Sequence, residues 1–331
     1  MDKKTAISYG INFALIVLLF ALLQFLNSIG IIDSYFQRIL LVVGVNIILA
    51  VSLNLTVGFL GQLALGHAGF MAVGAYAAAI FTKSVKMDSN LELIISIIIA
   101  ALFAGIVGII IGVPALRIKG DYLAIITLGF GEIIRVIINN LSITGGSRGL
   151  SGIEAHAKFP HVYWVTVLCV VIVVLLIRSR HGRAIISIRE DEIAAEMAGI
   201  PITYYKILGF ATSAALTGVA GSLYAHINRV LNAEKFNFEY SIDILVIVVL
   251  GGMGSVTGSI IAAIVLTILP ESLKFLDEYR MLIYSIALIL MMIFRPSGLF
   301  GKYEFSLSKL IFKDKSKKAK PEELEDKEAA R

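Results

Sequence analysis

Long apolar segments follow one another through most of this sequence, and they restrict the fold more than any other feature. A helix needs about 20 apolar residues to cross a hydrocarbon core. Only 16% of the 331 residues are charged and 58% are hydrophobic, whereas ordinary soluble domains carry about 25% charged residues. The sequence therefore predicts an all-α, polytopic integral membrane protein. The ten candidate spans are residues 12–30, 38–57, 67–82, 91–113, 122–139, 161–178, 204–226, 240–251, 258–272 and 281–295.

The two ends of the chain differ from this apolar body. The first 25 residues pass from a basic start into an apolar run, as a signal peptide does, but no cleavage site of small residues follows. We therefore expect an uncleaved first span. Residues 302–331 are mixed in charge and low in complexity, which is typical of a partly disordered tail. The predicted organisation is a transmembrane domain over residues 1–301 and a charged cytoplasmic tail over 302–331.

Two glycine-rich stretches interrupt the apolar pattern, at residues 57–69 (VGFLGQLALGHAG) and 250–259 (LGGMGSVTGS). The third, eighth and ninth candidate spans, which flank them, are short. Non-helical backbone survives at membrane depth only where protein or a water-filled cavity covers it. We therefore expect both breaks to face the interior of the bundle and to frame a translocation path. The candidate path residues are Asn54, Gly58, Gly61, Gln62, Gly66, His67, Gly251, Gly252 and Gly254.

The placement of basic residues predicts the orientation. Ten spans with a cytoplasmic N-terminus put both termini on the cytoplasmic side, in agreement with the positive-inside rule. On this topology the first five and the last five spans run in opposite directions, and each half contains one glycine break. That arrangement is typical of transporters built from an inverted repeat. The basic residues in the short cytoplasmic loops are Arg117, Lys119, Arg178, Arg180, Arg183 and Arg189.

The loop at residues 178–203 is the largest on the cytoplasmic side, and it carries helix signals of its own. Ser187 and Glu190 have the spacing of a capping box. Gly199 suits the left-handed position after a helix end, and Pro201 stops continuation. These signals predict one helix of about eleven residues, which would be marginal alone in water. It is either an interfacial helix that covers the bundle or a docking helix for a cytoplasmic partner. Its small and apolar surface residues are Ile188, Ile193, Ala194, Ala195, Met197, Ala198 and Ile200.

Two charges lie inside the fifth candidate span. Glu132 and Arg135 are three residues apart, so they share a helix face and can pair. Each would cost about 2.5–3.5 kcal/mol at mid-membrane on insertion scales, and pairing lowers that cost. Intramembrane ionisable residues are functional candidates. The two charges form either a structural ion pair near the outer interface or a group that gates or orients the substrate.

The sequence contains no motif for binding nucleotide phosphates. A P-loop needs G-x-x-x-x-G-K-[ST], and the nearest match, Gly301-Lys302, is followed by Tyr303. Energy for transport must then come from a partner or from an ion gradient. We expect this chain to hold no cofactor and to bind no nucleic acid, with membrane lipid as its surroundings.

Two further patterns favour structural over catalytic roles. Ser147 lies in a Gly-x-Ser-x-Gly sequence, but its place in a loop between helices favours a turn over a hydrolase nucleophile. His67 has no accompanying ligand set, so we expect no metal site. The sole cysteine, Cys169, excludes a disulfide framework.

The cytoplasmic loop carries a specific resemblance. Residues 181–225 resemble the loop signature of bacterial branched-chain amino acid ABC-transporter permeases of the LivM type. Ser187 departs from that signature, where alanine is expected. The matching residues are Gly182, Arg183 and Ala184; Ile188, Arg189 and Glu190; Glu192, Ala194 and Ala195; and Gly199 and Ile200. Further stretches similar to this family are residues 53–79, 120–140, 144–153 and 250–263.

The resemblance implies a fuller assembly. The chain would be a permease subunit of a binding-protein-dependent ABC importer for leucine, isoleucine and valine in a bacterial plasma membrane. Its partners would be a homologous permease of the LivH type, two cytoplasmic ATPase subunits and an extracytoplasmic amino-acid-binding protein. ATP and magnesium would reside on the ATPase subunits, so the chain itself would not be an enzyme. The loop at residues 178–203 would contain the coupling helix, which docks on an ATPase.

Three alternatives remain open. The same kind of importer could carry urea, a short amide, a sugar or another small polar solute. An ion-coupled secondary transporter would need a carboxylate at a mid-membrane ion site, for which Glu132 is the candidate. An intramembrane enzyme would need a catalytic pair inside the spans, and the sequence offers none.

Overall fold

The computed structural model describes residues 3–30, 33–85, 88–118 and 120–273, together with a few positions between 279 and 301. The expected last span lies mostly outside the described residues, and the expected tail lies wholly outside them. The chain divides into two units, residues 1–32 with 305–331 and residues 33–304.

The first unit contains one described element, the helix α1 (Lys3–Ser28). It begins earlier than the predicted first span. Several large apolar side chains of α1 are exposed, among them Leu18 and Phe25. An apolar helix of 26 residues that exposes such side chains fits a lipid environment.

The second unit is a helical bundle with two short strands. Leu150 of β1 pairs with Leu231 of β2 in an antiparallel register. A π-helical turn (Leu55–Phe59) and two 3₁₀ turns (Gly146–Arg148 and Ala233–Phe236) complete it. The helices and strands are α2 (Ser34–Asn54), α3 (His67–Ser84), α4 (Ser89–Ala115), α5 (Asp121–Asn140), β1 (Leu150–Ser151), α6 (Phe159–Arg178), α7 (Arg180–Glu190), α8 (Glu192–Met197), α9 (Ile202–Asn228), β2 (Val230–Leu231), α10 (Phe238–Gly251) and α11 (Val256–Ser272).

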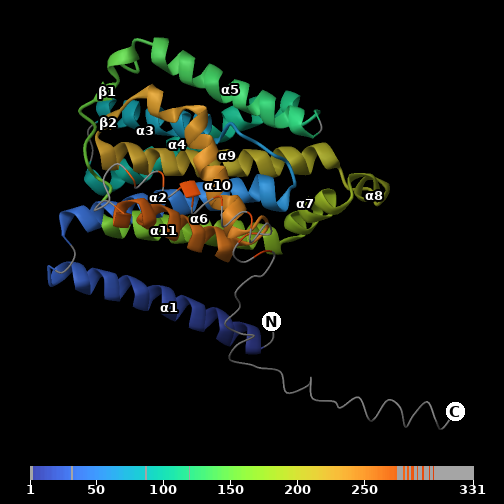
Figure 1. Ribbon diagram of the computed structural model, residues 1–331, viewed down its shortest axis with the longest axis horizontal. Coiled ribbons are helices and arrows are strands. Elements are labelled where there is room, and N and C mark those ends of the chain that lie inside the picture. Colours follow the sequence, from blue (N-terminus) through green and yellow to red (C-terminus); the bar gives the residue numbers. More distant parts are fainter. Residues whose placement is uncertain are drawn as a thin grey trace, which may run out of the picture. The chain divides into compact units, whose positions relative to one another are not determined.

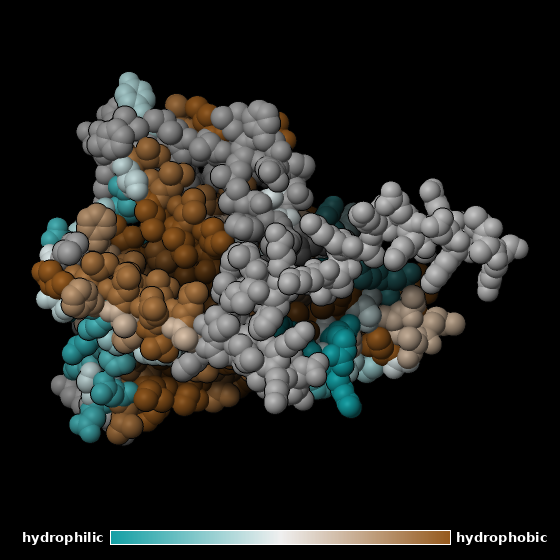
Figure 2. Space-filling view, turned by 90° about the horizontal axis from the view of Figure 1, so that it is seen from below, coloured by the Kyte–Doolittle hydropathy of each residue, from teal (hydrophilic) through white to brown (hydrophobic). Residues whose placement is uncertain are grey.

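The bundle confirms a polytopic membrane architecture. Each predicted span from the second to the ninth coincides with a helix whose ends differ from the prediction by a few residues. Within the described part of the chain, four helical segments are long and apolar enough to cross a membrane: α2 with its π-helical extension, α4, α6 and α9. α11 is a shorter apolar helix. Much of the face seen in Figure 2 is apolar, as a lipid-facing surface must be.

Small residues bring α3, α4 and α9 into close contact at the centre of the bundle. A Cβ atom on Gly218 of α9 would lie 2.5 Å from the carbonyl oxygen of Ala100 on α4. One on Gly221 would lie 2.2 Å from the carbonyl oxygen of Met71 on α3. Only glycine permits backbones to approach this closely. Close helix packing of this kind drives association in lipid, where burial of apolar surface supplies little force.

The two ends of the bundle carry different elements. α7 and α8 project from one end, and the β1–β2 pair lies at the other (Figure 1). Lys83 at the end of α3 donates a hydrogen bond of 3.1 Å to the carbonyl of Ser151, so α3 finishes at the β1–β2 end. We call the two ends the α8 end and the β1–β2 end.

Candidate functional site

The first glycine break begins where α2 widens into its π-helical turn. The amide of Leu60 donates to the carbonyl of Leu55 at 3.1 Å, the wider spacing of a π-helix. Gly61 then takes a positive φ of 71°, which side chains with a Cβ atom rarely adopt. The helix α3 starts only at His67. The predicted break is therefore confirmed, with narrower bounds: it consists of the π-helical turn and the non-helical residues 60–66, and residues 67–69 of the predicted range belong to α3.

The second glycine break separates α10 from α11. α10 ends at Gly251, and Gly252 and Gly254 take positive φ angles of 111° and 86°. Ser255 caps the next helix by accepting a hydrogen bond of 3.1 Å from the amide of Gly258. The chain thus reverses tightly, and no side chain larger than hydrogen fits the two turn positions without strain.

Asn54 joins the two breaks. Its side-chain nitrogen donates to the carbonyl of Ser255 at 2.9 Å and to the hydroxyl of Ser259 at 2.8 Å. Its side-chain oxygen accepts from the amide of Gly254 at 2.8 Å. Asn54 is fully buried, so these bonds satisfy polar groups that water does not reach. Segments 200 residues apart in sequence are therefore held together at one point.

Arg189, from the loop between α6 and α9, reaches the same point. Its Nη1 donates a hydrogen bond of 2.7 Å to the carbonyl of Gly58. A Cβ atom on Gly61 would lie 2.7 Å from Arg189 Cγ, and one on Gly254 would lie 3.1 Å from Nη1. Glu190 pairs with the same guanidinium. We call Arg189 with Gly58, Gly61 and Gly254 the Arg189 junction.

The loop itself contains two helices, which corrects the prediction of one. Ser187 does not cap a helix: it lies inside α7, where its hydroxyl donates to the carbonyl of Ala184 at 2.8 Å. The cap of α8 is Asp191, whose carboxylate accepts from the amides of Ile193 and Ala194 at 2.9 and 3.0 Å. A carboxylate at the N-cap also gains from the helix dipole, so the chain breaks at Asp191 although Ser-x-x-Glu matched the spacing.

The other end of α8 agrees with the sequence. Gly199 has a φ of 79°, which confirms the predicted left-handed position. The amide of Ile200 donates to the carbonyl of Ala195 at 3.1 Å, and that of Gly199 donates to Glu196 at 2.9 Å. This pair of bonds is a Schellman motif. Pro201 follows directly and precedes α9.

α8 is attached to the bundle on one side and free of it on the other. Ala195 is buried, and Glu192 pairs at 3.0 Å with Lys206 of α9, whose side chain is 4% exposed. Ile193 and Met197 are 73% and 85% exposed. The apolar surface predicted for this segment is therefore smaller than expected, because Ile188 belongs to α7 and is buried.

The remaining loop residues lie on the surface of the α8 end. Arg183 is exposed on α7, and its Nη1 donates to the carbonyl of Arg178 at 3.3 Å. Ser179 caps α7 by accepting from the amide of Gly182 at 3.2 Å. Ala194 is exposed beside Ile193. The structure thus brings Arg189 to the glycine breaks and leaves Arg183 in its own segment.

His67 and Gln62 lie in or beside the first break but do not converge on Asn54. His67 is buried, with its Nε2 3.4 Å from the hydroxyl of Ser52 and 3.3 Å from that of Ser213. The backbone amide of Gln62 donates a hydrogen bond of 2.9 Å to the carbonyl of Thr56. Gly66 packs against the backbone of α5, where its Cβ atom would lie 2.6 Å from Thr127 O.

The two charges predicted inside the fifth span, Glu132 and Arg135 of α5, are paired, and they also hold another helix. Arg135 Nε donates to Glu132 Oε2 at 2.7 Å. Glu132 Oε1 accepts a hydrogen bond of 3.0 Å from the amide of Phe238, the first residue of α10. A carboxylate at a helix N-terminus stabilises the dipole. The sequence predicted the ion pair but gave no signal for this contact, because the two residues are 106 positions apart.

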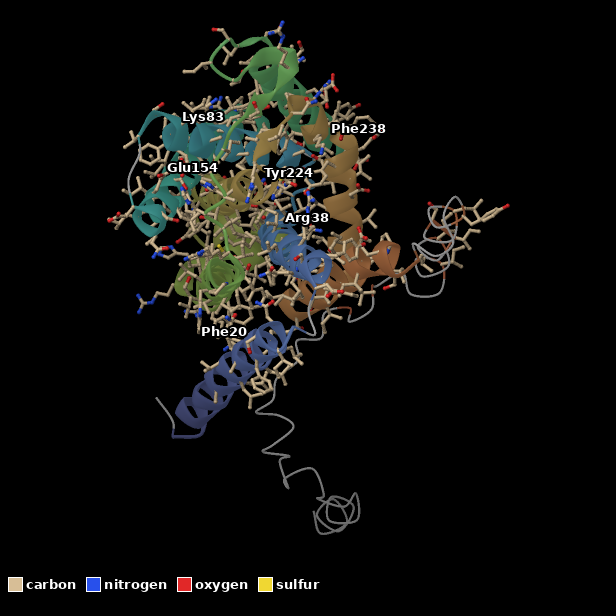
Figure 3. The ribbon with its side chains drawn as sticks, turned by 90° about the vertical axis from the view of Figure 1, so that its left-hand side faces the viewer. Phe20, Arg38, Lys83, Glu154, Tyr224 and Phe238 are labelled. Atoms are coloured by element: carbon tan, nitrogen blue, oxygen red, sulfur yellow. The ribbon has the colours of Figure 1, made fainter. Side chains whose placement is uncertain are left out.

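Two features at the β1–β2 end, a group of polar side chains and a pocket, were not predicted from the sequence. Glu92 is 2% exposed and lies 3.3 Å from Nε2 of His156. A pocket of about 350 Å³ lies between α2 and α11, and Arg38 lines it. Figure 3 labels Arg38 on α2. Neither feature has a local motif, since its members come from distant segments. The pocket is lined by Tyr35, Arg38, Ile39, Val42, Thr267 and Glu271.

The serine in the Gly-x-Ser-x-Gly sequence lies apart from these groups. Ser147 is exposed in the 3₁₀ turn Gly146–Arg148. His156, the nearest histidine in sequence, bonds instead with Ser89 at 2.8 Å. Among the described residues, no group of three or more His, Cys, Asp or Glu side chains is placed to hold a metal ion.

The geometry can be compared with known proteins. Residues 35–293 match the family model of the branched-chain amino acid transport system permease component. The chain belongs to this permease family. The match covers every helix of the second unit, both glycine breaks and the Arg189 junction.

Named relatives agree with the family. The chain is 38% identical to the high-affinity branched-chain amino acid transport system permease protein LivM of Escherichia coli, over 70% of this chain and 61% of LivM. It is 26% identical to the probable LivM of Methanocaldococcus jannaschii, over 62% and 68%. It is 30% identical to LivH of Salmonella typhimurium, over 51% and 55%. The chain therefore spans about three fifths of the length of the bacterial LivM proteins it matches. No solved structure matches it.

Proposed function

We propose that this chain is the transmembrane permease subunit of a binding-protein-dependent ABC importer that takes up leucine, isoleucine and valine. The observation that carries the proposal is the α8 end. A short helix with apolar residues exposed on one side and an ion pair on the other suits docking to a second protein. Membership of the permease family supplies the cargo class, because the bacterial relatives are named for branched-chain amino acids.

The proposed orientation puts the α8 end in the cytoplasm of a bacterial inner membrane. Ten spans, of which the last lies mostly outside the described residues, would leave both termini there. An inverted repeat of five spans would run the two halves in opposite directions. It does not relate the two glycine breaks to each other, because both lie at the α8 end and repeat-related breaks would lie at opposite ends. Six basic residues in the loops at residues 117–119 and 178–189 favour this orientation.

The proposed partners follow from the two ends. An ATPase subunit binds Ile193 and Met197 of α8, and it holds ATP and magnesium. A second permease of the LivH type forms the other half of the membrane part, with its own ATPase. An amino-acid-binding protein docks at the β1–β2 end. Membrane lipid covers the apolar flanks.

The two glycine breaks form the moving part of the proposed translocation path. They meet at Asn54, at the α8 end of the bundle, where a change in one must alter the other. Urea, short amides or another small polar solute are the alternative cargo. An ion-coupled mechanism is less well supported, because Glu132 is engaged by Arg135 and by the amide of Phe238.

The test is ATP-dependent uptake of radiolabelled leucine by proteoliposomes that contain the whole assembly. Ile193→Glu and Met197→Glu should abolish uptake and release the ATPase from the membrane fraction. Ile193→Leu and Met197→Leu keep the apolar surface and should transport normally. ATP-driven assembly with uptake of urea but not leucine would refute the cargo. Normal uptake by the two glutamate variants would refute docking through α8.

A further inference from the structure

We propose that Arg189 is the positioning residue that transmits the movement of α8 to both glycine breaks at once. The inference rests on the proposed function, since it assumes that an ATPase moves α8. It adds a specific route: the motion passes through the Arg189 junction rather than through helix packing alone.

Arg189 lies between a helix that is fixed in the bundle, α7, and a helix that is exposed, α8. Ile185 and Ile188 hold α7 in the bundle, where they are 1% and 3% exposed. Arg189 is one residue from the end of α7, and Asp191, the cap of α8, follows two residues later. A displacement of α8 therefore reaches the backbone of Arg189 before it reaches the buried part of α7.

The side chain of Arg189 occupies a space that exists because glycines surround it. Three glycines surround it, and a Cβ atom on Gly61 would lie 2.7 Å from Arg189 Cγ. Any other residue at Gly58 would collide with Asn54, at 1.8 Å from its Oδ1. The absence of these side chains lets a long arginine enter between the breaks. Its side chain is 22% exposed, so its hydrogen bond is partly shielded from water.

Two hydrogen bonds couple one break to the other. Arg189 donates to the carbonyl of Gly58 in the first break at 2.7 Å. Asn54 accepts from the amide of Gly254 in the second break at 2.8 Å. Gly58 packs directly on this bond, since a Cβ atom on it would lie 2.3 Å from the amide nitrogen of Gly254. A pull on Gly58 is therefore passed to Gly254. Glu190 pairs with the guanidinium and fixes its orientation.

Arginine suits this role better than lysine. Its planar guanidinium offers five N–H donors in a fixed geometry. One edge can bond with Glu190 while Nη1 bonds with Gly58. Lysine would keep the charge but could not hold both contacts in one plane. We therefore expect Arg189→Lys to restore only part of the function that Arg189→Gln loses.

The experiment uses the complete assembly and a readout that does not depend on cargo. Hydrogen exchange of peptides covering residues 55–66 and 250–258 is measured with and without ATP, for wild type, Arg189→Gln and Arg189→Lys. The control is Arg180→Gln, which removes the same charge from the exposed first residue of α7. ATP should change exchange in both breaks of the wild type and of the control.

In Arg189→Gln the ATPase should stay bound and hydrolyse ATP, while the ATP-dependent change disappears from both breaks together. Leucine taken up per ATP should fall about tenfold, the factor expected from losing one hydrogen bond to a charged group. Arg189→Lys should lie between this variant and the wild type.

Three results would overturn the proposal: an unchanged response in Arg189→Gln, loss of the response in one break only, or release of the ATPase from that variant. The last would make Arg189 a docking or folding residue. Failure of the proposed function looks different, because then wild type itself would bind no ATPase or take up no leucine.

Discussion

Asn54 shows how one side chain can decide the relation between two distant segments. Its three hydrogen bonds serve the backbone and side chains of the second break; the bonds to Ser255 and Ser259 are buried, and the bond from Gly254 is part-buried. Removing one partner of a buried bond leaves the other unsatisfied, which costs about 1–3 kcal/mol for each group. The position therefore has a larger structural role than its place beside a break indicated.

Asn54→Leu should lower the free energy of unfolding by about 2–4 kcal/mol, because the amide of Gly254 loses its partner and the hydroxyl of Ser259 keeps only its bond to the carbonyl of Ser255. Thermal unfolding in detergent measures the change. Asn46→Leu is the matched control, since Asn46 makes a single part-buried bond of 2.9 Å to Thr267. Equal effects of the two substitutions would contradict the role assigned to Asn54.

The sequence predicted these residues better than it predicted their contacts. Glycine spacing located both breaks, and Gly199 before Pro201 located the end of α8. The bond between Asn54 and Gly254 and the bond between Arg189 and Gly58 join positions more than a hundred residues apart. No periodicity or local motif specifies such pairs, because they depend on how the helices pack.

At the scale of an element, α8 is held by an ion pair whose carboxylate, Glu192, belongs to the residues that the sequence placed in the coupling helix. Lys206 is almost fully buried and bonds with Glu192 at 3.0 Å. A buried charge that loses its partner is strongly destabilising. Glu192 therefore fixes α8 against α9, and the exposed apolar surface of α8 comes from Ile193 and Met197.

Glu192→Lys should reduce the membrane-bound ATPase about tenfold, an order-of-magnitude effect that corresponds to about 1.4 kcal/mol. Two cations would then face each other and displace α8. The double variant Glu192→Lys with Lys206→Glu restores an opposite pair and should recover most of the binding. Co-purification of the two subunits measures it. If the double variant binds no better than Glu192→Lys, Glu192 contacts the ATPase directly.

The glycine breaks give a second prediction at this scale. Gly61→Trp and Gly252→Trp should abolish uptake and leave the ATPase bound, because both positions need a positive φ and have no room for a side chain. Uptake and co-purification are measured on the same membranes. Gly129→Ala in α5 is the control, since a Cβ atom there meets nothing within 4 Å. Normal uptake by both tryptophan variants would remove the breaks from the path.

The loop helix also shows why a local signal can mislead. Ser187 and Glu190 matched a capping box, but Ile185 and Ile188 are drawn into the bundle, so α7 continues through both positions. The chain then breaks at Asp191, which caps α8. A helix cap contributes about 1 kcal/mol. Burial of an isoleucine side chain contributes about 1.5–3 kcal/mol, so burial of two outweighs the local capping preference.

For the whole molecule, the proposed topology places the α8 end and the β1–β2 end on opposite sides of the membrane. The described helices are consistent with alternation between the two ends, and Figure 1 shows the loop helices and the strand pair far apart in the second unit. Apolar length predicted this architecture from sequence. In the proposed topology, the basic loops place the α8 end in the cytoplasm.

Cysteine labelling in intact cells tests the orientation. Cys169 is buried, and Cys169→Ala gives a background without thiols. An impermeant thiol reagent should label Ser147→Cys at the β1–β2 end from outside. It should label Glu196→Cys on α8 only after the cells are opened. The reverse pattern would invert the topology, and labelling of both from outside would contradict a membrane between them.

The bond from Arg189 to Gly58 ends on a main-chain carbonyl, and this has a consequence for how such a chain can vary. A contact between two side chains can be lost at one position and repaired at the other. Here every residue type offers the same carbonyl, and glycine alone fits the space. A substitution at position 58 therefore cannot compensate for a change at Arg189. Substitutions at Arg189 or Glu190 can therefore alter this contact, but no substitution at Gly58 can restore it.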